Sequence, residues 1–188
     1  MRSSRWTLFR NRSFLFYWLG YLLSHVGDSV FLIAAAWLVA DVTGSGWMMG
    51  AYFMCLGIPR VLLMLVGGVF VDRMEPRTWM LLSDGLRGVV MILFYLLIVD
   101  GTPSVWGLYV IAVLFGTVDA VYWPAANKLR QRVVARENYS QANGVLVGSM
   151  QMAMIAGPVL GAALLALGGT GLAVLFNGIS FFVSALTL

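Results

Sequence analysis

Six apolar runs, each long enough to cross a lipid bilayer, constrain the fold of this chain more than any other feature. A membrane-spanning helix needs roughly 20 predominantly apolar residues, because every residue adds only about 1.5 Å of length. The runs cover residues 14–40, 47–71, 78–99, 105–127, 140–167 and 171–188. The strands of a membrane barrel are much shorter and alternate in polarity. The sequence therefore predicts an all-α transmembrane fold, a six-helix bundle.

The composition agrees with a membrane location. Apolar residues make up 61% of the chain and charged residues 11%, whereas soluble domains average about 45–50% and about 25%. The net charge of +4 comes from short clusters between the apolar runs and not from one basic face, so we expect no nucleic acid partner. The single cysteine, Cys55, lies within an apolar run and can form no internal disulfide.

Lysine and arginine are concentrated in three of the segments outside the predicted helices. Ten of the twelve fall in the N-terminal segment, the second connection or the fourth connection, and the other three connections hold none. Positive charge marks the cytoplasmic side of a membrane protein. We therefore predict a cytoplasmic segment over residues 1–13, a six-span bundle over residues 14–188, and cytoplasmic N- and C-termini.

The last apolar run reaches Leu188 without the basic segment that follows the other cytoplasmic helix ends. We expect from this that the chain is the N-terminal half of a longer protein and that a comparable C-terminal six-helix half is missing. A natural half-sized protein that works as a dimer is the alternative.

Ionisable side chains inside the predicted spans are the first candidates for function, because each costs a few kcal/mol at membrane depth. There are six of them: His25, Asp28, Arg60, Asp84, Arg87 and Asp119. Counting about 1.5 Å per residue from the predicted cytoplasmic ends places Asp28 and Arg60 at similar depth on neighbouring helices. We therefore expect these two to pair.

The other four ionisable residues have a structural as well as a functional interpretation. Asp84 and Arg87 are three residues apart on one helix face, which favours a self-neutralising pair. His25 fits a hydrogen-bonded packing residue. Asp119 has no partner nearby in the sequence, so it is the best candidate for carrying a proton, together with Asp28.

The connection after the second run carries a recognisable motif. It comprises Gly68, Asp72, Arg73 and Arg77, on the predicted cytoplasmic side. This pattern resembles the loop between helices 2 and 3 of the major facilitator superfamily, G-x-x-x-D-R-x-G-x-R, with Glu75 where that family usually has glycine. The resemblance implies that these residues gate the transporter by stabilising one conformation.

A second motif lies in the fifth run and comprises Gly148, Gly157, Pro158 and Gly161. Glycines four residues apart allow close helix approach, and proline permits a kink. The motif resembles the helix-5 motif of the superfamily's antiporters, with Ala162 in place of its last glycine. Tight packing alone is the alternative explanation for these glycines.

The stretch from Asp119 to Ala126, followed by Ala142-Asn143-Gly144, is similar to the helix 4–5 region of bacterial drug-efflux permeases of the macrolide-efflux type. The resemblance implies one half of a twelve-span protein in a bacterial inner (plasma) membrane, with substrate bound between two six-helix bundles. The helix-4 arginine of other drug–proton antiporters is absent, and Asp119 lies in its neighbourhood.

Together these features predict a secondary active transporter, not an enzyme, that exports amphiphilic or cationic small molecules by proton-coupled alternating access. Its expected partners are the small-molecule substrate, protons, membrane lipids and the C-terminal half, with no cofactor and no metal. Uptake, siderophore or lipid transport by the same fold remains an alternative, as does a membrane interaction protein that does not transport.

Overall fold

A computed structural model describes residues 6–71, 75–99, 101 and 103–188 of the chain. These residues form helices joined by short connections and contain no strand, which confirms the predicted all-α class. The elements are α1 (Trp6–Phe9), α2 (Arg12–Thr43), α3 (Gly46–Val71), α4 (Pro76–Val99), α5 (Val105–Asp119), α6 (Tyr122–Val133), the 3₁₀ turn η1 (Arg136–Asn138) and α7 (Tyr139–Thr187).

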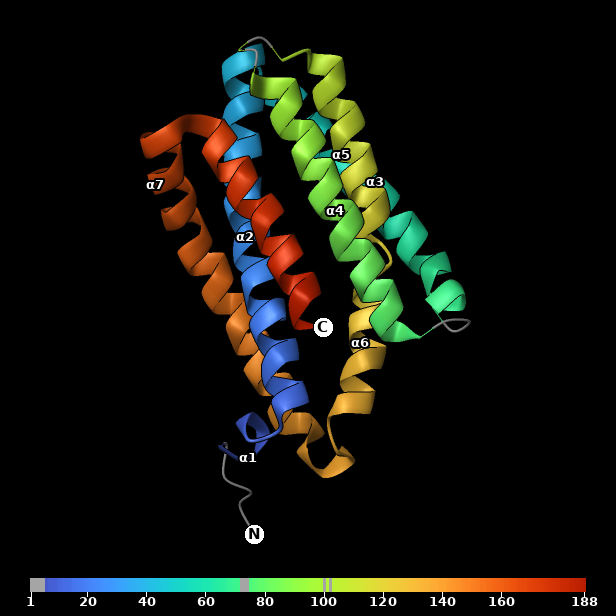
Figure 1. Cartoon of the computed structure of the whole chain (residues 1–188). Coiled ribbons are helices and arrows are strands. Elements are labelled where there is room, and N and C mark those ends of the chain that lie inside the picture. Colours follow the sequence, from blue (N-terminus) through green and yellow to red (C-terminus); the bar gives the residue numbers. More distant parts are fainter. Residues whose placement is uncertain (1–5, 72–74, 100, 102) are drawn as a thin grey trace.

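Within the described residues, five helical segments are long and apolar enough to cross a membrane. They are α2, the Gly46–Leu65 part of α3, α4, α5 together with α6, and the Arg136–Thr187 segment that contains α7. The chain reverses direction within α7 at Gly168 and Gly169. Gly169 has a φ of 66°, which L side chains rarely adopt. Residues 139–167 and 170–187 are therefore two arms that run in opposite directions (Figure 1).

Helix α2 packs along both arms of α7 more extensively than any other pair of elements packs together. Glycines make this possible on each side. On the first arm, a Cβ at Gly157 would collide with Ser29 of α2. On the second arm, a side chain at Gly20 of α2 would collide with Thr187. The missing side chains let the helix backbones approach closely, as small residues do in membrane bundles.

The fourth predicted run, residues 105–127, is interrupted in the structure. Helix α5 ends at Asp119 and α6 begins at Tyr122. Pro124 explains the break, because it has no N–H to donate to the carbonyl of Ala120, four residues earlier. The interruption leaves Asp119 as the last residue of α5.

Two apolar clusters make up most of the core. The buried charged residues lie between them. On α2, Phe14 and Tyr17 belong to one cluster and Phe31 to the other. On α4, Met80 and Phe94 are divided in the same way. The buried charged residues Asp84, Arg87 and Asp119 contact one another between the two clusters and form one layer across the bundle.

Candidate functional site

The guanidinium of Arg87 is the centre of the polar layer and is fully buried. Its Nη1 donates to Asp119 Oδ1 at 3.1 Å, and its Nη2 donates to Asp84 Oδ1. The rings of Tyr122 and Phe181 lie 4.1 Å and 4.4 Å from the guanidinium carbon. Arg87 therefore joins α4, α5, α6 and α7 through charge and ring contacts, and the predicted pair of Asp84 with Arg87 is present.

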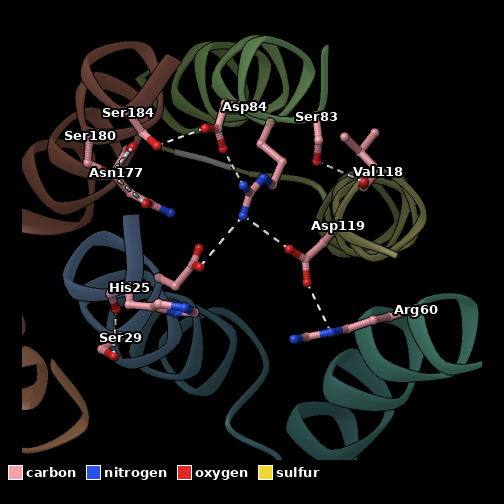
Figure 2. Close-up of polar contacts among 12 residues, drawn as sticks. His25, Ser29, Arg60, Ser83, Asp84, Val118, Asp119, Asn177, Ser180 and Ser184 are labelled. Atoms are coloured by element: carbon pink, nitrogen blue, oxygen red, sulfur yellow. Dashed lines mark hydrogen bonds and ion pairs between the residues drawn. The ribbon is translucent and has the colours of Figure 1, made fainter. Parts of the chain in front are cut away.

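Asp119 accepts hydrogen bonds or ion pairs from two arginines at once. Its Oδ1 faces Arg87, and its Oδ2 lies 3.0 Å from Nε of Arg60. Its side chain is only 5% exposed, whereas that of Arg60 is 35% exposed. Figure 2 shows Asp84, Asp119 and Arg60 converging from α4, α5 and α3. Asp119 has no partner nearby in the sequence, and its two partners come from α3 and α4.

Asp28 is the most loosely held acid of the layer. Its Oδ2 lies 3.7 Å from Arg87 Nη1, an ion-pair distance that is too long for a good hydrogen bond. Its Oδ1 has no hydrogen-bond partner among the residues that the structure describes. The side chain is 25% exposed, although its carboxylate interacts with charges on α3, α4 and α5.

The expected pair of Asp28 with Arg60 is not what the structure shows. Arg60 pairs with Asp119, and Asp28 faces Arg87. Equal depth on neighbouring helices was a necessary condition for pairing but not a sufficient one. The packing of α3 against α5 turns Arg60 toward α5 instead of α2.

The acidic and basic side chains of the layer are unequal in number. The layer holds three carboxylates, Asp28, Asp84 and Asp119, and two guanidinium groups, Arg60 and Arg87. If all five are ionised, the charge of this group is 2 − 3 = −1. One bound proton would make it neutral, and a neutral group is the less costly one in a membrane interior.

His25 lies one turn from Asp28 on α2 and is held between aromatic rings. Its ring centroid is 4.2 Å from that of Tyr21 and 5.5 Å from that of Trp123. Its Nε2 is buried and finds no hydrogen-bond partner within the described part of the chain. Trp123 also lies against the guanidinium of Arg60 at 5.9 Å. His25 and Arg60 therefore share a neighbour at the edge of the charged layer.

The described residues of the two sequence motifs take no part in the ion pairs of this layer. In the helix-5 motif, Gly157 and Gly161 pack against Ser29 and Ile33 of α2, whereas Pro158 and Gly148 are exposed. In the loop motif, Gly68 belongs to α3 and Arg77 is an exposed residue in the first turn of α4. Asp72 and Arg73 lie outside the described residues.

Glu75, the residue that departs from the loop motif, has a clear role in the structure. Its Oε1 accepts a hydrogen bond from Arg132 Nη1 at 2.6 Å. The end of α6 is thereby joined to the start of α4. Nearby, Asn143 Oδ1 accepts a hydrogen bond from Arg130 Nη1 at 2.8 Å, so an asparagine of the third resemblance stabilises the turn between α6 and α7.

The sequence did not place three further residues in this layer, although one of them, Tyr122, lies in the stretch that resembles the macrolide-efflux permeases. Ser184 Oγ donates to Asp84 Oδ2 at 2.8 Å, and Tyr122 and Phe181 contact Arg87. Asn177, Ser180 and Ser184 repeat at helical spacing within an otherwise apolar run, and this signal could have identified the serine. The rings could not have been identified, because aromatic residues are common throughout the chain. Among the residues that the structure describes, no three or more His, Cys, Asp or Glu side chains are arranged so that they could hold a metal ion.

The chain was compared with known proteins. Residues 17–188 match the family model of the Major Facilitator Superfamily. The uncharacterized MFS-type transporter YkuC of Bacillus subtilis is 27% identical over 184 residues, which are 96% of this chain and 42% of that protein. The enterobactin exporter EntS of Citrobacter koseri is 29% identical over 128 residues, 68% of this chain and 31% of the exporter.

The chain therefore spans less than half of the length of these relatives. The matched region covers the helices that carry the charged layer and the helix-5 motif. Together with the long apolar helices, this match identifies a multi-pass membrane protein. The chain belongs to the Major Facilitator Superfamily of transporters.

Proposed function

We propose that the protein is a secondary active exporter of small molecules that works by alternating access and is driven by the inward flow of protons. The observation that carries this proposal is the unequal charge of the buried layer, with three carboxylates against two guanidinium groups. A layer that is neutral with one proton and anionic without it can bind and release that proton in each cycle.

Asp28 is the acid we assign to proton carriage. Asp84 and Asp119 each accept at least two hydrogen bonds or ion pairs. Asp28 has one long ion pair and an unpartnered oxygen, so it is the carboxylate of the layer with the fewest contacts and the one most available to exchange a proton. Asp119, the stronger candidate from the sequence, instead holds Arg60 and Arg87 in place.

The substrates we propose are amphiphilic or cationic molecules. When Asp28 is deprotonated, the layer has a net negative charge next to the rings of Trp123 and His25, and a cation is attracted to both carboxylates and ring faces. A cation and a proton would then compete for the same charge, which is the basis of exchange. The likeness of residues 119–144 to macrolide-efflux permeases supports drug export as the cellular role.

Export of a siderophore is the second candidate. The support is the likeness to enterobactin exporters, including that of Escherichia coli O1:K1 at 28% identity over 128 residues. A membrane interaction protein without transport is a weaker candidate, because it does not require a buried layer that exchanges protons. Proton-coupled uptake would use such a layer equally well, and the likeness to exporters is what favours export.

We further propose a bacterial inner membrane location with both termini in the cytoplasm, and a C-terminal six-helix half as partner. The bacterial relatives and the greater length of those relatives support this arrangement. The loop residues Asp72, Arg73 and Arg77 would gate the movement of the two halves against each other.

The test uses the protein expressed from its complete gene and reconstituted into liposomes with an imposed pH gradient. Ethidium is the cationic probe and enterobactin the siderophore probe. We expect gradient-driven movement of ethidium by the wild type and its loss in Asp28→Asn, while exchange of ethidium across liposomes without a gradient continues. The exposed Asp41 provides the control, because Asp41→Asn removes a carboxylate outside the layer. Movement of enterobactin alone would favour the second candidate, and movement that ignores the gradient would contradict proton coupling.

A further inference from the structure

A seam of polar side chains lies between α2 and the second arm of α7. The α7 face of the seam carries Asn177, Ser180, Ser184 and Thr187, and the α2 face carries Gly20, Ser24 and Gly27. A Cβ at Gly20 would lie 3.1 Å from Ser184 Oγ and would collide with Thr187 Oγ1. A Cβ at Gly27 would collide with Ser180 Oγ and Asn177 Oδ1. The backbone of α2 therefore lies directly against these oxygen atoms.

The hydroxyl groups of the seam differ in their hydrogen bonding. Ser180 Oγ donates to the backbone carbonyl of Asn177 at 2.7 Å and lies 3.2 Å from Asn177 Oδ1, so the hydrogen bonds of this hydroxyl are made within α7. Ser24 behaves differently, because it is 1% exposed and its Oγ has no hydrogen-bond partner in the described ranges. A buried hydroxyl without a partner is destabilising, and a water molecule bound to it would remove that penalty.

Helix geometry places the unpartnered hydroxyl of Ser24 on the path between Asp28 and Thr187. Ser24 is one turn from Asp28 and one turn from Gly20 on the same side of α2. Since Gly20 contacts Ser184 and Thr187, the seam continues from Ser24 to these two hydroxyls. Figure 2 shows Ser184 and Ser180 on the same helix, with Ser184 directed toward Asp84.

The seam ends at Thr187, at the end of the bundle that the charge pattern predicts to be cytoplasmic. Thr187 lies there in a hollow with Tyr17, Arg12 and Arg77. Thr187 is three residues, about one helical turn, from Ser184. Water that reaches Thr187 from the cytoplasm would therefore be about one turn of helix from the serine that donates to Asp84.

We propose that protons pass between Asp28 and the cytoplasm through this seam, by way of Ser24, Ser184 and Thr187 and of water held between them. This inference rests on the proposed proton coupling. In each transfer the hydroxyl oxygen of Ser24 accepts a proton from the Asp28 carboxyl while its own proton moves to the next oxygen, so no charge remains on the serine. The path lies inside the six-helix bundle. A proton can thus leave while substrate occupies the side of the layer that carries Arg60 and Trp123.

Charged groups surround the acid end of this path on several elements. Arg87 and Asp84 on α4, Asp119 on α5 and Arg60 on α3 all act on the Asp28 carboxylate. His25 precedes Asp28 on α2. The α7 side of the seam contributes only neutral hydroxyl and amide groups among its described residues, so the proton leaves along the side that has no fixed charge.

Thiol labelling tests whether water reaches the seam. In the complete protein with Cys55 and every other native cysteine changed to serine, single cysteines replace Ser24, Ser184 or Ser83, and a charged methanethiosulfonate reagent is added to everted vesicles. Ser83 is the matched control, because it is 3% exposed, is adjacent to Asp84, and donates to Val118 O at 3.2 Å away from the seam. We expect Ser24→Cys and Ser184→Cys to react about tenfold faster than Ser83→Cys, since the reactive thiolate forms only where water reaches it. Equal rates at the three positions would overturn the path.

Proton release tests whether the seam conducts. A pH-sensitive dye follows proton release by the reconstituted complete protein when ethidium is added. We expect Ser24→Ala to slow release about tenfold, at the low end of what one positioned proton-transfer group contributes, while Ser83→Ala has no effect. Unchanged release in Ser24→Ala would overturn the path and leave proton coupling intact. Absence of release from the wild type would overturn both proposals, whatever the labelling shows.

Discussion

Arg87 of α4 and Asp119 of α5 are joined by a hydrogen bond of 3.1 Å between Nη1 and Oδ1, at the residue where α5 ends. This contact lies between the two apolar clusters of the bundle, at the level where α2 and α4 pass from one cluster to the other. The same aspartate holds Arg60 of α3. The charged layer therefore has a structural role in addition to the proton exchange that we propose.

Replacement of the central arginine should be severe. Arg87→Met leaves Asp84 without its buried counter-charge and Asp119 with Arg60 alone, and breaking a buried ion pair costs about 3–5 kcal/mol. We expect a much lower yield of folded protein and a lower midpoint of thermal unfolding in detergent. The exposed Arg136 gives the control, because Arg136→Met removes the same side chain at a surface turn. Equal stability of the two variants would contradict the central position of Arg87.

The two aspartates that face arginines should differ in their effect on stability. Asp119→Asn weakens the hold on two guanidinium groups, whereas Asp28→Asn removes one ion pair of 3.7 Å. We expect Asp119→Asn to lower the midpoint of thermal unfolding and Asp28→Asn to leave it almost unchanged. A larger drop in the midpoint for Asp28→Asn than for Asp119→Asn would mean that Asp28 stabilises the fold and that the assignment of proton carriage to Asp28 is wrong.

The glycines of the helix-5 motif should not be equivalent. A side chain at Gly157 would meet Ser29 of α2, whereas nothing lies within 4 Å of a Cβ at Gly148. Overpacking costs about 1–3 kcal/mol, so Gly157→Val should destabilise the bundle and Gly148→Val should not. Thermal unfolding of both variants checks this. A normal midpoint for Gly157→Val would show that α2 and the first arm of α7 are not in close contact.

The reversal within α7 depends on one backbone conformation. Gly169 has φ 66° and ψ −167°, a combination that is almost restricted to glycine. Gly169→Ala should therefore cost about 1–3 kcal/mol. Gly144→Ala in the first arm should be neutral or slightly stabilising, because alanine is the better helix former and no atom lies within 4 Å. Equal destabilisation by the two changes would argue against a turn at Gly169.

The surface pair of Glu75 and Arg132 should contribute little. Their side chains are 68% and 51% exposed, and exposed ion pairs contribute about 0–1 kcal/mol. Glu75→Gln should leave the midpoint of thermal unfolding within the error of measurement. A large drop in the midpoint would indicate that the connection before α4 contributes to the stability of the bundle.

Much of the fold could be predicted from the sequence, because long apolar runs and glycine-rich turns are local features. The all-α class and the long apolar helices follow from run length alone, and Gly168-Gly169 was recognisable as a turn. The interruption between α5 and α6 was not predicted. Its signal, Pro124, was present, but apolar length dominated the interpretation of that run.

The candidate site could be predicted as a set of residues but not as a network. Membrane depth selects Asp28, Arg60, Asp84, Arg87 and Asp119, and all five meet in one layer. Which acid faces which arginine depends on the rotation of each helix about its axis, and a depth count contains no information on rotation. For the same reason, the contact of Ser184 with Asp84 became visible only in three dimensions.

Proton exchange by the charged layer is tested most directly by counting the protons that the complete, purified protein releases when ethidium binds. The layer has one carboxylate more than it has guanidinium groups. We therefore expect about one proton to be released per protein molecule near neutral pH, and none from an Asp28→Asn variant that still binds ethidium. Release of one proton by both proteins, or by neither, would contradict the assignment of proton exchange to this layer.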